Sequence, residues 1–165
     1  MQIRKTTGLV AVVATIFAAA QTQPTPKEIW GRWEVRRELP TRTISCWGES
    51  DARRIIGTQI EYSDKIFRWK QIIVNNPVAD ERIVTADQFR KENSSPSADG
   101  SQIDFQQLGI LDRQTKEISI RHDPANITRA TVEIPGDSVL VKNADTIVFS
   151  VCSIYFEATR IRDKK

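Results

Sequence analysis

The side chains best suited to chemistry are few in this chain, and they are scattered. His122 is the only histidine among the 165 residues, and Asp123 follows it directly. A histidine beside an aspartate could act as a general base for a serine brought close by the fold. Adjacent residues of a strand point to opposite faces, so this pair is poorly placed to act together. We therefore expect His122 to be a surface residue.

Neither the carboxylates nor the sequence motifs indicate a catalytic site. Asp104, Asp112 and Glu157 stand singly, so their spacing predicts no carboxylate pair for hydrolysis. The chain has no phosphate-binding loop, dinucleotide-binding glycine pattern, zinc-protease helix or nucleophile elbow. We expect a non-enzymatic protein without a cofactor or a metal site.

The N-terminus has the pattern of a secretory signal peptide. Arg4 and Lys5 precede a short apolar run that ends in three alanines at 18–20, and the run is too short to span a bilayer. We expect cleavage after residue 20, an extracytoplasmic (periplasmic or secreted) protein, and no stable membrane insertion afterwards. The net charge of +3 includes these two basic residues. The mature chain is therefore nearly neutral, which indicates no nucleic-acid partner.

Secretion bears on the two cysteines, Cys46 and Cys152. Oxidising compartments favour a disulfide between such a pair, and neither cysteine has a second one nearby with which to hold a metal. The predicted bond would join an early strand to a late one. Closing so long a loop stabilises a fold by at most roughly 4 to 5 kcal/mol in the chain-entropy account.

One domain is expected over residues 29–162, after a flexible, proline-containing leader at 21–28. Short helices are predicted after Ser50 and from a capping box, Thr85 to Gln88. A polar loop is expected at 93–101, and Asn93 and Asn126 begin glycosylation sequons that matter only in a host that glycosylates. Alternating apolar and polar residues predict strands at 30–37, 43–47, 58–62, 66–74, 78–84, 117–121, 130–134, 139–142, 146–151 and 155–161.

These short strands indicate an all-β fold, an antiparallel up-and-down barrel of about eight strands with one or two short helices. Gly31-Arg32-Trp33 in the first strand and Arg160 at the end of the last resemble the G-x-W signature and closing arginine of lipocalins. The resemblance implies that Arg160 packs over Trp33 and seals the barrel. The second lipocalin loop signature is absent from residues 143–146, and another small β-barrel or a sandwich stays an alternative.

Aromatic residues are concentrated in the predicted strands. Tyr62, Phe67 and Trp69 are candidates for lining an apolar ligand pocket, if the barrel closes with spare volume. The same rings could simply fill the core, because a barrel of about eight strands is just wide enough to be filled by side chains.

Two functions are compatible with these patterns. The first is a secreted or periplasmic lipocalin-like barrel that binds a small hydrophobic molecule. The second is a protein-binding module, such as an inhibitor or immunity factor against a secreted hydrolase. Its contact surfaces would be the loop at 93–101 and the segment Trp47-Gly48-Glu49.

Overall fold

The computed structural model describes residues 23–41, 45, 48–93, 102–122 and 133–162. Ten strands form one antiparallel sheet in the order β1-β6-β7-β8-β9-β10-β2-β3-β4-β5. The helical elements are η1 (Lys27–Ile29), α1 (Glu49–Arg53) and α2 (Ala86–Glu92). The strands are β1 (Gln23–Pro24), β2 (Gly31–Glu38), β3 (Gln59–Tyr62), β4 (Ile66–Trp69), β5 (Ile72–Asn75), β6 (Val78–Thr85), β7 (Gln114–Arg121), β8 (Ser138–Asn143), β9 (Thr146–Val151) and β10 (Ile154–Arg160).

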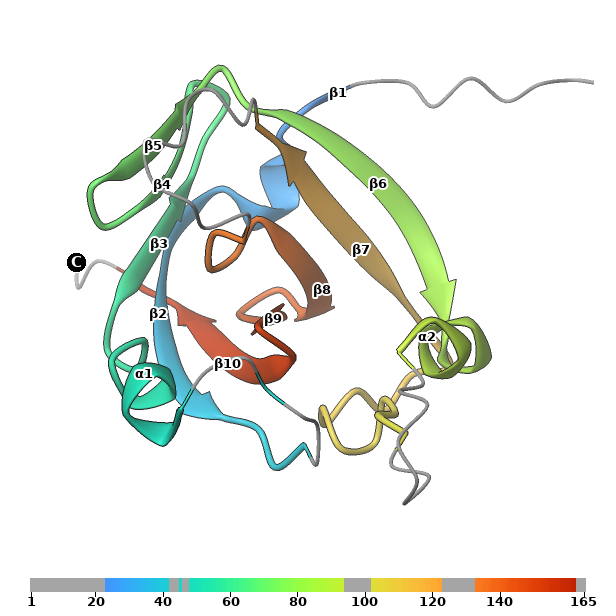
Figure 1. Ribbon diagram of the computed structural model, residues 1–165. Helices are drawn as coiled ribbons and strands as arrows, with labels where there is room; N and C mark the ends of the chain where they lie inside the picture. The colour runs from blue at the N-terminus through green and yellow to red at the C-terminus, as the bar shows by residue number, and fades with distance from the viewer. Residues whose placement is uncertain (1–22, 42–44, 46–47, 94–101, 123–132, 163–165) are drawn as a thin grey trace, which may run out of the picture.

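The sheet curls into a half-barrel. In Figure 1, β2 to β5 lie on one side and β6 and β7 on the other, with β8, β9 and β10 between them. Pairing of β10 with β2 joins the two sides. Although β6 follows β5 directly in the chain, its outer neighbour in the sheet is β1. The predicted all-β, barrel-like architecture is confirmed, whereas the described residues contain ten strands rather than about eight.

One additional strand comes from a hairpin inside residues 66–74, which the alternation predicts as a single strand. Lys70 has a φ of 52°, and the chain reverses there so that Trp69 pairs with Ile72. A two-residue hairpin turn usually contains glycine or asparagine, because it requires positive φ. Lys70-Gln71 lacks that signal, so the hairpin could not be recognised from the turn residues.

The two helices differ in how well their starts were predicted. Thr85 caps α2 as expected: the Gln88 N–H donates to Thr85 Oγ1 at 3.2 Å, and the Thr85 N–H donates to Gln88 Oε1 at 3.0 Å. Helix α1 begins before Ser50, because its N-cap is Gly48, whose N–H donates to Asp51 Oδ2 at 3.3 Å. The prediction of Ser50 as the cap is therefore wrong.

Residues 23–28, predicted as a flexible leader, pack onto the sheet. β1 pairs with Val78 and Ala79 of β6. Thr25 is buried, and its carbonyl accepts a hydrogen bond from the Trp30 indole at 2.8 Å. The packed fold therefore includes residues before 29.

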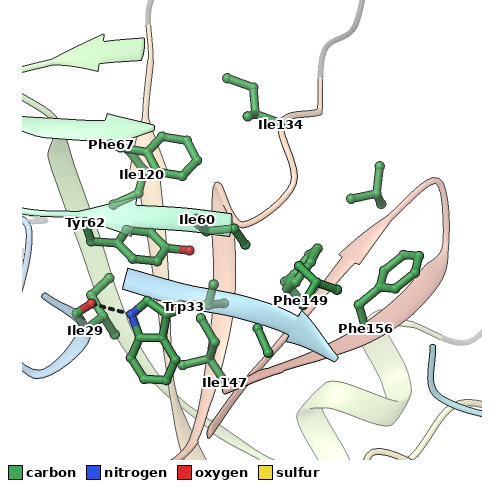
Figure 2. Close-up of a cluster of buried hydrophobic side chains, with 14 of the residues drawn as sticks. Ile29, Trp33, Ile60, Tyr62, Phe67, Ile120, Ile134, Ile147, Phe149 and Phe156 are labelled. Atoms are coloured by element: carbon green, nitrogen blue, oxygen red, sulfur yellow. Dashed lines mark hydrogen bonds between the residues drawn. The ribbon is translucent and has the colours of Figure 1, made fainter. Parts of the chain in front are cut away.

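Apolar side chains cover both faces of the central strands. On the inner face, Trp33, Tyr62, Phe67, Phe149 and Phe156 are among the fully buried residues of one cluster (Figure 2). On the outer face, α2 and residues 103–110 cover a second cluster that consists of Leu39, Val84, Phe89, Ile103, Phe105, Leu108, Ile110, Leu140, Val148 and Tyr155. Burial on both faces explains the consecutive apolar residues at 139–141, 147–149 and 154–156 in β8, β9 and β10. Within the described segments, no helix is long and apolar enough to cross a membrane.

Candidate binding site

The residues of the lipocalin resemblance lie together where β10 meets β2. The Arg160 guanidinium carbon is 4.1 Å from the ring centroid of the buried Trp33, whose indole N–H donates to the Ile29 carbonyl at 2.8 Å (Figure 2). A guanidinium suits this position because it can stack on an aromatic ring and donate several hydrogen bonds at once. Arg160 also donates to the carbonyl oxygens of Glu28, Trp30 and Ala144.

Glycine fits at position 31 for two reasons. Its φ of +117° disfavours any other residue, and a Cβ there would lie 3.2 Å from Nη1 of Arg160. Partial burial lowers the pKa of Arg160, an effect that the Asp145 carboxylate opposes, and the guanidinium stays charged at neutral pH. Gly31, Trp33 and Arg160 thus form a structural junction between β2 and β10.

The three predicted pocket residues occupy different surroundings. Tyr62 and Phe67 are 1% exposed, and their rings stack with centroids 5.4 Å apart. The Tyr62 hydroxyl donates to the Gly136 carbonyl at 2.7 Å. Trp69 is half-buried, and its indole N–H donates to the Thr58 hydroxyl at 3.1 Å. None of the three lines the cavity described next.

A cavity of about 60 Å³ lies on the outer face of the sheet, beneath α2. The register explains its position, because Arg82 of β6 pairs with Glu117 of β7, which pairs with Leu140 of β8. A space of this size holds a few water molecules or the end group of a small molecule. Phe89 and Asn93 line it from the helix side, and the sheet contributes Arg82, Glu117, Ser138, Val139, Leu140, Val148, Phe149, Ser150 and Tyr155.

Hydrogen bonds fix the polar groups of this cavity. Arg82 donates to Glu117 at 2.5 Å and to Glu92 at 2.6 Å. Ser138 donates to the second oxygen of Glu117 at 3.3 Å. The walls therefore combine polar groups that are held by hydrogen bonds with apolar side chains.

Tyr155 forms the wall contributed by β10. Its hydroxyl donates to Asn93 Oδ1 at 2.8 Å, and its ring packs edge-on against Phe89 with centroids 6.1 Å apart. Burial raises the pKa of Tyr155 to about 12, and the Glu117 carboxylate adds to the increase. The phenol is therefore protonated at neutral pH and acts as a hydrogen-bonding group.

A second polar pair was missed by sequence reasoning. His122 Nε2 lies 3.3 Å from Oδ2 of Asp137, which also accepts from the Ile134 N–H at 3.0 Å. Burial raises the pKa of Asp137, although the Ile134 N–H and His122 oppose the increase. The His122 side chain is 13% exposed, so the prediction of a surface residue is wrong. The pair joins the end of β7 to the turn before β8, and sequence spacing alone could not reveal it.

Several predicted features lie outside the described residues: Cys46, Trp47, residues 94–101, Asp123 and Asn126. Cys152 lies in the turn between β9 and β10, with a φ of 51°. Because Cys46 is not described, the Cys46–Cys152 disulfide stays a prediction. Among the residues that are described, no three His, Cys, Asp or Glu side chains are grouped so that they could hold a metal ion.

Glu157 of β10 is expected to make an acid-sensitive contribution to the stability of the fold. Burial raises its pKa, but hydrogen bonds from Arg37 (3.0 Å) and Lys142 (2.8 Å) outweigh burial, so the pKa is lowered overall. A lowered pKa stabilises the fold above the unfolded value of about 4.3, and this stability is lost as the pH falls through the lower folded value.

Glu157→Gln is therefore expected to lower the free energy of unfolding by about 1–2 kcal/mol at pH 7 and by much less near pH 3. Urea unfolding at both pH values measures the difference. Glu61→Gln, which removes a more exposed ion pair with Arg68, is the control and should cost under about 1 kcal/mol. A loss at Glu157 that is equal at both pH values would contradict the assignment.

Comparison of the chain with protein-family models, curated proteins and solved structures finds no match.

Proposed function

We propose that this chain is a non-enzymatic, lipocalin-like binding protein that works outside the cytoplasm and holds a small molecule, or its end group, beneath α2. The observation that carries the proposal is the cavity with fixed polar groups and apolar walls. The Arg160–Trp33 stack supports the lipocalin-like architecture, and the N-terminal pattern at 1–20 supports an extracytoplasmic location.

The outer cavity is favoured over the barrel interior because the inner aromatic rings pack against one another. Tyr62 stacks on Phe67, and Phe149 stacks on Phe156 with centroids 5.6 Å apart. Rings packed in this way fill the volume that a ligand would need. We keep part of the expectation that the ligand is hydrophobic, because Phe89 contributes an apolar surface to the cavity.

The proposed disulfide fits the same architecture. The turn that contains Cys152 precedes Ile154, the first residue of β10, and Phe156 of β10 pairs with Glu38 at the end of β2. Cys46 follows Glu38 by a short segment of chain. A bond between the two cysteines would brace the β10–β2 junction on the side away from Arg160.

Native mass spectrometry of the protein purified from its host compartment tests the proposal. The wild type should carry an additional small-molecule mass that disappears on denaturation. Ser138→Val, which adds bulk to the cavity, should lack that mass, whereas Thr159→Val, a matched change on β10 outside the cavity lining, should retain it. A bare wild-type mass, or a mass retained by Ser138→Val, would contradict the proposal.

The alternative of a protein-binding module stays a prediction. Of its main predicted surface, the loop at 93–101, only Asn93 is among the described residues, and the cavity gives this alternative no additional support.

A further inference from the structure

The start of the packed fold limits where the N-terminal segment can be removed. β1 (Gln23–Pro24) pairs with Val78 and Ala79 of β6. Thr25 is 1% exposed, and its carbonyl accepts a hydrogen bond from the Trp30 indole at 2.8 Å. Cleavage within or beyond β1 would remove this pairing and this contact. A processing site that leaves the fold intact therefore precedes β1.

Within that limit, the sequence selects one processing site. Between the end of the apolar run at Phe17 and β1, alanine occupies both the first and the third position of a triplet only at Ala18-Ala19-Ala20. Small residues at these two positions are the cleavage signal of a secretory peptide. Cleavage after Ala20 makes Gln21 the first residue of the mature chain. Gln21 lies outside the described residues, which begin with Gln23 of β1.

An N-terminal glutamine contains both partners of a cyclisation. Its α-amine reaches the side-chain amide carbon through a five-membered ring, so that an intramolecular step replaces a bimolecular encounter. The α-nitrogen forms a bond to Cδ, the Cδ–Nε2 bond breaks, and the departing nitrogen takes one proton from the α-amine and leaves as ammonia. The step needs no oxidant and no co-reactant. Because free α-amines have pKa values of about 7.7–8.0, part of the nucleophile is unprotonated at neutral pH.

We infer that removal of residues 1–20 exposes Gln21 and that this N-terminal glutamine cyclises to pyroglutamate. This inference rests on the extracytoplasmic location in the proposed function and is independent of the cavity. The lactam has no charge and no primary amine, so an aminopeptidase cannot begin digestion there. The modification thereby protects β1, which covers part of the outer edge of β6.

The test uses the full chain, exported and purified from the extracytoplasmic compartment of its host, then reduced and denatured. Intact-mass spectrometry of the wild type should give residues 21–165 less one molecule of ammonia, and fragment spectra should assign the loss to the first residue. Gln21→Asn is the matched control, because it keeps the amide but is one methylene shorter and could close only a strained four-membered ring. The variant should keep its ammonia, and an aminopeptidase should shorten it but leave the wild type intact.

Each failure gives a different mass. A wild type that begins at Gln21 and keeps its ammonia after several days at neutral pH would refute cyclisation and leave the proposed location standing. A chain that begins at Thr22 or Gln23 would overturn the assignment of Gln21 as the modified residue. Retention of residues 1–20 would overturn both the inference and the extracytoplasmic location. If Gln21→Asn is not processed, pyroglutamyl peptidase decides with the wild type alone: it should remove the first residue and restore digestion by the aminopeptidase.

Discussion

Replacing Trp33 with alanine is expected to lower the free energy of unfolding by about 3–5 kcal/mol, the usual range for removal of a large buried aromatic side chain. Trp33 is 1% exposed, its indole N–H is bonded to the Ile29 carbonyl, and Arg160 covers its ring. The substitution leaves a cavity and an unpaired carbonyl where β2 meets β10. Thermal and urea unfolding measure the loss, which corresponds to a decrease in Tm of about 10 °C.

Trp30→Ala is the matched control, because Trp30 is half-buried and also donates its indole N–H to a backbone carbonyl. It should cost less than half as much. A double-mutant cycle with Arg160→Ala then measures the stack itself, and we expect a coupling energy of about 0.5–3 kcal/mol between the two residues. Equal losses for Trp33→Ala and Trp30→Ala, with no coupling to Arg160, would show that the junction contributes nothing specific.

Sequence reasoning succeeded where local pattern and burial agree. The alternation around Ile118 and Ile120 predicts one buried face, and the structure buries both residues in β7. The capping box at Thr85 predicts the start of α2, because both of its hydrogen bonds are local. Such features depend on residues a few positions apart, which a single sequence displays directly.

The cavity could not be predicted in the same way. Its wall joins Arg82, Glu117 and Tyr155 from three separate strands, and only the sheet register brings them to one face. The charged residues of β6 look like an ordinary solvated strand face in the sequence. The His122–Asp137 pair is hidden for the same reason, since its partners meet only because the fold brings the turn before β8 to the end of β7.

The inner and outer faces of the half-barrel therefore have different roles. The inner face packs Trp33, Phe149 and Phe156 and stabilises the fold. On the outer face, α2 leaves a space between Phe89 and the sheet in which Glu117 stays partly accessible. Glu117 belongs to neither apolar cluster, so substitutions at Glu117 are suitable tests of binding.

Gly136→Ala is expected to be the other severely destabilising substitution, because two effects act together at this turn. The φ of Gly136 is +86°, which costs roughly 1–2 kcal/mol for a residue with a side chain. The new Cβ would also lie 2.6 Å from the Tyr62 hydroxyl oxygen and 2.8 Å from Cδ1 of Ile60. Overpacking of this kind typically costs a further 1–3 kcal/mol.

Gly57→Ala separates the two effects, since Gly57 has a similar φ of +82° and no atom lies within 4 Å of the position that a Cβ would take there. We expect a loss of about 1–2 kcal/mol at Gly57 and of about 2–5 kcal/mol at Gly136, measured by urea unfolding. Adding Tyr62→Phe to Gly136→Ala should recover part of the difference, because it removes the nearest oxygen. Equal losses at the two glycines would mean that the turn before β8 can move away from Tyr62 at no cost in stability. This result would contradict tight packing of the turn against the inner aromatic cluster.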